Sequence, residues 1–242
     1  MGRVALAGLV ILSAAPAHAQ SVADAMPASS PLWTAVGLSA LALAPFVLVV
    51  TTSFAKIAVV FSLLRSALGA PNVPPNSVLA ALALILTAYV MAPVAALVAA
   101  AAEPLLDLER APLTVEEARI WVDTLATVAE PLRAFLELNA GAAELEAFAR
   151  LRGAAPSGWS VVVPAFAITE LAEAFQIGFL LYLPFLVLDL LVGSVLLSLG
   201  MHMLTPASVS MPFKLLLFVS VNGWLLLSES LVLAYAIPGA AP

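Results

Sequence analysis

The residue in this 242-residue chain that most invites a chemical role is Asp189, a lone carboxylate in the apolar stretch PFLVLDLLVGSVLLSLGMHMLTP (184–206). In the centre of a membrane helix a charged side chain costs about 2.5–3.5 kcal/mol, so Asp189 should face protein or water. One interpretation is a proton or ion relay. The other is a structural partner for a base or backbone donor, such as Lys214 on the next apolar block. The second is favoured because transporters normally show more than one intramembrane acid.

Three more polar residues lie in the apolar blocks near the C-terminus: Lys214, Asn222 and Glu229. Glu229 raises the same question as Asp189 but is less central in its block. Polar groups inside a membrane need partners, and one small chain supplies few, which predicts contacts with other subunits. Lys56 follows the residues TTSF (51–54) and is expected to extend its ammonium toward the cytoplasmic face, with its stem packed on neighbours.

The apolar stretch of Asp189 ends on Met201-His202-Met203, whose sulfur and imidazole groups are soft ligands for copper. Adjacent residues rarely converge on one ion without further ligands, so a metal site is not expected. The only other histidine is His18, and the chain has neither a Gly-rich phosphate loop nor a Gly-x-Ser-x-Gly elbow. The sequence therefore predicts no enzyme, no cofactor and no metal.

The composition defines the kind of protein that holds these residues. With 63% hydrophobic residues, 10% charged residues and a mean hydropathy of +1.11, the chain is predicted to be an integral membrane protein. It has no cysteine, which excludes disulfides and thiolate metal sites. Residues 103–173 hold 12 of the 15 acids and five of the nine bases, and nothing resembles the basic stripe that nucleic-acid binding requires.

The N-terminus has the parts of a secretory signal peptide. One base, Arg3, precedes an apolar core and the small residues of APAHAQ (15–20), so cleavage is expected before Gln20. With this cleavage, residues 1–19 are the signal peptide and residues 20–32 a short polar lead-in. The alternative is that residues 1–19 stay attached as an uncleaved first helix.

Four long apolar blocks follow, at 33–64, 77–102, 176–199 and 213–237. Each exceeds the roughly 20 residues that a helix needs to cross about 30 Å of hydrocarbon. They pair as two hydrophobic hairpins, 33–102 and 164–242. In the first, Gly69 is expected to end a helix before the proline-containing turn APNVPPN (70–76).

The acidic segment between the hairpins, 103–163, is predicted to be a small helical subdomain. Its TVEE sequence fits a capping box from Thr114 to Glu117, and Pro131 suits the first turn of a second helix. The only strand signal is WSVVVP (159–164). The sequence therefore predicts an all-α membrane protein, with two long helical hairpins around a small helical subdomain.

The bases near the hairpin turns indicate the topology. Lys56 and Arg65 lie near the first turn and Lys214 near the second, so the positive-inside rule places both turns in the cytoplasm. The acidic segment is then outside, in agreement with a signal peptide. Small residues at Gly178, Gly193, Ser194 and Ser198 suit close helix contacts, either between subunits or within one chain.

Four stretches of this chain closely resemble one family. They are TTSFAKIAVVFSLLRSALGAPNVPPN (51–76), YVMAPV (89–94), PAFAITELAEAFQIGFLLYLPFLVLDLL (164–191) and GMHMLTPASVSMPFKLLLFVSVNGW (200–224). They resemble the FliP/SctR family of inner-membrane export-gate proteins, found in the bacterial flagellum and in type III secretion injectisomes. The resemblance covers both hydrophobic halves and is loose across the acidic centre.

The resemblance implies a multi-pass protein of the bacterial inner membrane with a periplasmic central segment. Family members form a pentameric ring with SctS/FliQ-type and SctT/FliR-type subunits and dock with the SctU/FlhB type. Unfolded secreted proteins pass through the centre. The second hairpin is then pore-lining, and Met201, His202 and Met203 form a gasket in the lumen.

The chain also departs from the family. The methionine run of the family is here Met201-His202-Met203-Leu204, and its usual Asp before Gly-Trp is here Asn222. KIAVVFSLLR, YVMAPV and LLYLPF resemble the injectisome branch, whereas a cleavable signal peptide resembles the flagellar branch, which stays the alternative. Two other hypotheses are a small ion-coupled carrier that uses Asp189 and a structural membrane scaffold without a lumen.

Overall fold

The computed structural model of the chain describes residues 31–70, 73–103 and 115–239, and in these ranges all regular structure is helical. The helices are α2 (Pro31–Thr51), α3 (Phe54–Leu68), α4 (Asn76–Ala101), α6 (Val115–Asn139), α7 (Ala142–Arg152), α8 (Trp159–Ser198), α9 (Pro206–Ser220) and α10 (Gly223–Leu233). The predicted all-α fold is confirmed. The expected signal peptide, most of the lead-in and Thr114 of the capping box lie outside the described residues.

Two of the described helices, α4 and α8, are long and apolar enough to cross a membrane by themselves. The pairs α2/α3 and α9/α10 pass the same test when each is taken as one broken span, which gives up to four spans. The break between α9 and α10 bends the chain by 60°. Each of these four candidates overlaps one of the four apolar blocks of the sequence, with the closest agreement at α4.

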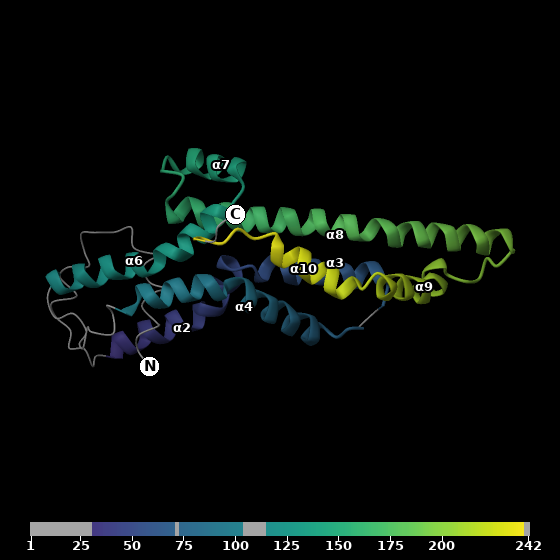
Figure 1. Ribbon diagram of the computed structural model, residues 1–242, viewed down its shortest axis with the longest axis horizontal. Helices are drawn as coiled ribbons and strands as arrows, with labels where there is room; N and C mark the ends of the chain where they lie inside the picture. The colour runs from purple at the N-terminus through teal and green to yellow at the C-terminus, as the bar shows by residue number, and fades with distance from the viewer. Residues whose placement is uncertain (1–30, 71–72, 104–114, 240–242) are drawn as a thin grey trace. The chain divides into compact units, whose positions relative to one another are not determined.

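Helix α8 runs without interruption for 40 residues (Figure 1). It begins at Trp159, so the short strand signal of WSVVVP lies in a helix, in agreement with the predicted all-α fold, and the helix also crosses the expected boundary at 163/164. Val161 and Val162 are fully buried there, and the rings of Phe135 and Phe166 lie 6.0 Å apart. Burial of the valines against α6 overrides their preference for strands, which is a weak determinant beside tertiary packing.

The chain divides into two compact units. Among the described residues, the first comprises 31–52, 92–103, 115–166 and 237–239, and its core is formed mainly by α6 and the start of α8. Its buried hydrophobic residues are Val94, Leu125, Phe135, Leu136, Val161, Val162, Ala165 and Phe166. Helix α6 continues through Pro131, where the sequence suggested the first turn of a new helix, so that expectation is wrong.

In the first unit, Arg133 connects α6 to the segment before α8. Its guanidinium pairs with Glu130 and Glu137 and donates to the Ser157 carbonyl at 3.0 Å. The hydrogen bond from Arg133 holds the pKa of the Glu130 carboxyl below its usual value and raises the pKa of the guanidinium. Both acids are partly exposed, so the two ion pairs contribute little stability. The hydrogen bond from Arg133 to the Ser157 carbonyl is the contact that holds the segment before α8 against α6.

The second unit comprises residues 53–91 and 167–236, and α3 lies in its centre. Seven of the 15 residues of α3 are buried, and they pack with residues of α4, α8, α9 and α10. The core is Ile57, Val60, Phe61, Leu64, Ala67, Leu68, Leu79, Ala83, Ala174, Phe185, Phe218, Leu227 and Leu231. Gly69 ends α3 at φ 69°, so the C-terminal glycine expected from the sequence is confirmed.

Candidate functional site

The loop between α8 and α9, residues 199–205, begins with a tightly defined helix end. Gly200 has φ 74°, its N–H donates to Leu197, and the Met201 N–H donates to the Leu196 carbonyl at 2.9 Å. These two bonds form a Schellman motif, which satisfies the carbonyls left open at a helix C-terminus. Thr205 and Pro206 then start α9, with proline in the first turn, where its missing N–H costs nothing.

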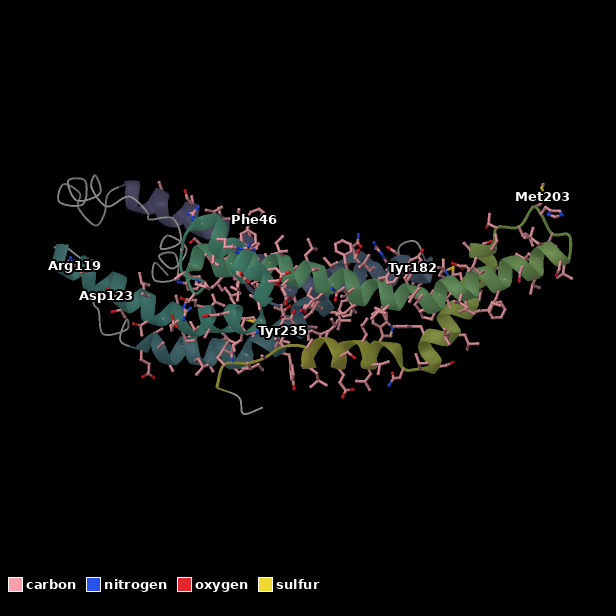
Figure 2. All side chains as sticks on the ribbon, turned by 90° about the horizontal axis from the view of Figure 1, so that it is seen from above. Phe46, Arg119, Asp123, Tyr182, Met203 and Tyr235 are labelled. Carbon is pink, nitrogen blue, oxygen red and sulfur yellow. The ribbon has the colours of Figure 1, made fainter. Side chains whose placement is uncertain are left out.

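The three residues of the expected gasket are all exposed in this loop. Met201 is 48% exposed and Met203 is 97% exposed, and His202 lies between them. Figure 2 shows Met203 at the tip of the loop, directed away from the helices of its unit. A methionine that is 97% exposed contributes almost nothing to the core of its own chain, and its side chain is accessible to another molecule.

Asp189 is held in a polar network with two residues of α9. Lys214 Nζ lies 2.7 Å from Asp189 Oδ2, and the Ser210 hydroxyl donates to Asp189 Oδ1. Lys214 is buried and also donates to the Ala67 carbonyl at 3.2 Å, near the end of α3. The network thus ties α3, α8 and α9 together, and it contains the ion pair that the structural interpretation of Asp189 predicts.

A second and more deeply buried network surrounds Lys56 at the start of α3. Its Nζ lies 2.7 Å from Glu170 Oε1 and 2.6 Å from Glu173 Oε2 of α8. The same Nζ lies 4.3 Å from the ring centroid of Tyr235, whose hydroxyl donates to Glu170. Lys56 is 2% exposed and Glu170 is fully buried, so the expectation that Lys56 reaches the cytoplasmic face is wrong.

Sequence reasoning missed Glu170, Glu173 and Tyr235 as partners of Lys56. The two glutamates were counted with the acids of residues 103–173, although they lie about three and four turns inside the long apolar helix α8. Their spacing of three residues places both on one face of a helix, and that was the available signal. A base is costly in such surroundings unless it is paired, so Lys56 would have been the natural candidate partner.

The break between α9 and α10 explains the residue at position 222. Asn222 has φ 52° and ψ 45°, the left-handed conformation that asparagine and aspartate adopt more readily than other non-glycine residues. A Cβ on Gly223 would lie 2.3 Å from the Phe218 ring, so only glycine fits there. Trp224 then packs against Phe218 and Phe61, at centroid distances of 5.2 Å and 6.1 Å.

This geometry gives a prediction for the turn. Asn222→Val should lower the free energy of unfolding by about 1–2 kcal/mol, because a β-branched residue is strained at positive φ. Asn222→Gly and Asn222→Asp should be close to wild type. The midpoint of thermal unfolding of the purified complex measures the difference, with Val221→Ile as a control at negative φ. Equal midpoints for the valine and glycine variants would show that backbone conformation does not decide this position.

The small residues of α8 serve contacts within the chain at two positions. A Cβ on Gly178 would lie 2.2 Å from Leu63 Cδ1, so this glycine allows α8 to approach α3. A Cβ on Gly193 would lie 3.5 Å from Pro206, which is ordinary contact. The hydroxyls of Ser194 and Ser198 donate to carbonyls three residues earlier in the same helix.

Glu229 stands apart from these networks. It is exposed on α10 and has no ion pair or hydrogen bond with any residue of the described ranges. Within those ranges no three His, Cys, Asp or Glu side chains gather in a way that could hold a metal ion. The polar residues of the second unit therefore include two internal networks, one left-handed turn at Asn222 and one acid, Glu229, without a partner among the described residues.

Comparison with known proteins identifies the chain's relatives. A sequence profile of the FliP family matches residues 38–231. The chain is 47% identical over 205 residues to the flagellar biosynthetic protein FliP of Caulobacter vibrioides, covering 81% of this chain and 74% of that one. It is 42% identical over 210 residues to the Yop proteins translocation protein R of Yersinia pestis, covering 82% and 93%. It is 39% identical over 220 residues to the virulence protein YscR of Salmonella typhimurium, covering 86% and 98%.

Proposed function

The chain belongs to the FliP family, and from this membership we propose that it is a core subunit of a type III export gate in the bacterial inner membrane. With partner subunits it forms the channel through which unfolded substrate proteins leave the cytoplasm. The chain supplies no chemical step in this function. It forms part of the channel wall, closes the channel at rest and makes the contacts that hold neighbouring subunits together.

The observation that carries this proposal is the exposed loop at the end of α8. A channel wide enough for an unfolded chain must not leak ions at rest, and flexible, polarizable methionines can close around an irregular substrate. Met203 is 97% exposed at the tip of this loop. Met201 and Met203 of each copy project into the lumen as a gasket, with His202 between them.

The gate contains several copies of this chain, a pentamer by family resemblance, together with SctS/FliQ-type and SctT/FliR-type subunits, and it docks with the SctU/FlhB type. The acidic segment, residues 103–163, lies in the periplasm. The large exposed apolar surface of α8 and α10 supports this arrangement, because such surface needs lipid or protein to cover it. Detergent extracts that contain the partners should hold a large stable complex, and the chain alone should be unstable.

The machine is an injectisome in this proposal, on the motifs KIAVVFSLLR, YVMAPV and LLYLPF, with the flagellar export gate as the alternative. The identities of 47% to a flagellar relative and 42% to an injectisome relative support both branches. Deleting the gene and measuring motility and effector secretion separates them. Loss of effector secretion with normal motility supports the injectisome, loss of motility alone supports the flagellum, and loss of neither contradicts the export function.

An ion-coupled carrier that uses Asp189 is the less favoured alternative. Asp189 is paired with Lys214 in the structure, and the pairing gives the acid a structural role without any transport step. The two other acids of α8, Glu170 and Glu173, lie more than four turns away from it and are also engaged, with Lys56. A carrier would need a titratable acid with an open route to each side of the membrane.

The gasket is tested by replacing both methionines with alanine. Met201→Ala with Met203→Ala should leave the complex assembled and raise its ion conductance severalfold, because alanine is too short to fill the lumen. Conductance of the purified complex in a planar bilayer measures the leak. Met211→Ala is the matched control, because Met211 lies in α9 outside the loop. Wild-type conductance of the double variant in an intact complex would contradict the gasket.

A further inference from the structure

The outer face of α10 carries a single carboxylate in an apolar surface. The inner face of this helix, with Gly223, Leu227 and Leu231, is buried in the core of the second unit. The opposite face consists of Leu225, Leu226, Glu229, Ser230 and Leu233, and its three leucines are 60%, 60% and 75% exposed. The Ser230 hydroxyl donates to the Leu226 carbonyl at 2.7 Å, so Glu229 is the group on this face that still needs a partner.

Neither lipid nor water suits this face. In hydrocarbon the ionised carboxylate of Glu229 costs about 2.5–3.5 kcal/mol, because no solvent replaces its hydration. In water the exposed leucines cost about 25 cal/mol for each Å² of apolar surface. A protein surface that is apolar and bears one cationic donor satisfies both requirements at once.

A copy of this chain does not offer such a cation in its second unit. Lys56 and Lys214 are buried there in ion pairs, and among the described lysines and arginines of this unit only Arg65 remains without one. Arg65 instead donates to the Asn76 side chain. The arginines of α6 and α7 lie on helices that are not candidate membrane spans.

The depth of Arg65 also separates it from Glu229. Helices α3 and α10 run antiparallel, because Trp224 packs on Phe61 and the Tyr235 hydroxyl reaches the Ser53 carbonyl at 3.4 Å. Trp224 and Phe61 therefore lie at about the same depth. Glu229 lies five residues from Trp224 toward Tyr235, and Arg65 lies four residues from Phe61 in the opposite direction. At 1.5 Å for each residue they differ in depth by about 13 Å. A salt bridge between these residues of neighbouring copies would therefore need the copies to be offset by about this distance along the axis of the assembly.

We propose that the outer face of α10 is a docking surface for an apolar helix of a different membrane subunit, whose lysine or arginine pairs with Glu229. The partner helix covers Leu225, Leu226 and Leu233, and its cation lies at the depth of the carboxylate. This inference rests on the proposed function, because it requires a gate made of more than one kind of chain.

Site-specific photocrosslinking in the native membrane tests which molecule covers this face. A photoreactive amino acid at Leu225 or Leu233 should form an adduct with another subunit of the complex, within about one turn of a Lys or Arg in an apolar helix. The same probe at Leu151, 83% exposed on α7, is the control for random capture. Adducts with a second copy of this chain, or only with lipid, would overturn the proposal.

Charge reversal tests the ion pair itself. Glu229→Lys should reduce the amount of that subunit recovered with the complex about tenfold or more, and Glu229→Gln should reduce it less, because an amide still accepts a hydrogen bond. Changing the cross-linked partner's base to glutamate should restore recovery with Glu229→Lys. Glu146→Lys, on exposed α7, is the control for adding a positive charge.

Two outcomes decide between this inference and the proposed function. If the gene is required for export but Glu229→Lys recovers the subunit as well as wild type does, the docking surface is wrong and the export function stands. If the gene is dispensable for both motility and effector secretion, the export function itself fails. Failure of the reversed partner base to restore recovery also contradicts the ion pair.

Discussion

Lys56→Met is expected to leave little folded chain in the membrane. The ammonium of Lys56 is 2% exposed and lies within 2.7 Å of both Glu170 and Glu173. Without it, Glu170 is an uncompensated charge with no exposure to solvent. Removing one partner of a buried ion pair typically costs about 3–5 kcal/mol, which is a large share of the total stability of a domain. The yield of intact complex and its thermal midpoint measure the loss.

Two further variants separate the charge from the packing. Lys56→Met combined with Glu170→Gln removes both buried charges, and it should recover much of the lost midpoint, because Tyr235 can still donate to the amide oxygen. Glu173→Gln alone should have a small effect, because that side chain is 46% exposed. A single Lys56→Met variant with the wild-type midpoint would show that the network contributes no net stability.

Asp189→Leu is expected to abolish assembly, whereas Asp189→Asn should retain most assembly and some export. Leucine leaves the buried ammonium of Lys214 with only the Ala67 carbonyl, while asparagine can still accept from Lys214 and Ser210. The loss for leucine should again be about 3–5 kcal/mol. Secreted protein and the yield of complex are measured for both variants.

The same pair of variants distinguishes a structural acid from a proton relay. A relay needs a titratable group, so asparagine would be as inactive as leucine in export although the complex assembles. The double variant Asp189→Leu with Lys214→Met removes both charges and should recover assembly if the pair is structural. Export by this double variant would exclude a relay at Asp189.

Much of the fold could be predicted from the sequence because its signals are local. Runs of apolar residues longer than a membrane span, and a glycine at position 69 before a proline-containing turn, do not depend on contacts elsewhere in the chain. The pairing of Asp189 with Lys214 was accessible for a similar reason, since Asp189 is the only acid of the block 176–199 and Lys214 is the only base of the next block, 213–237.

The networks that depend on distant contacts could not be predicted. Tyr235 reaches Glu170 from 65 residues away, and nothing in the local pattern of either residue indicates that approach. The role of position 222 also could not be predicted. It is to adopt a left-handed backbone conformation, whereas the sequence comparison shows only the charge that distinguishes Asn222 from the family's aspartate. The helical start of α8 at Trp159 results from burial against α6, which a strand propensity cannot register.

The length of α8 has a consequence for where the chain can sit in the membrane. Its 40 residues extend for about 60 Å, twice the thickness of the hydrocarbon layer, and a tilt of about 60° would be needed to immerse all of it. Membrane helices tilt by about 0–40°, so at least one end of α8 must project beyond the lipid. Its most apolar window is only 11% buried by its own chain. The start of α8 is covered by its own chain at Val161, Val162 and Phe166, whereas Leu190, Leu191 and Leu197 are more than half exposed. Wherever this second part of the helix leaves the lipid, neighbouring chains must cover it, so the lone protomer is an incomplete folding unit.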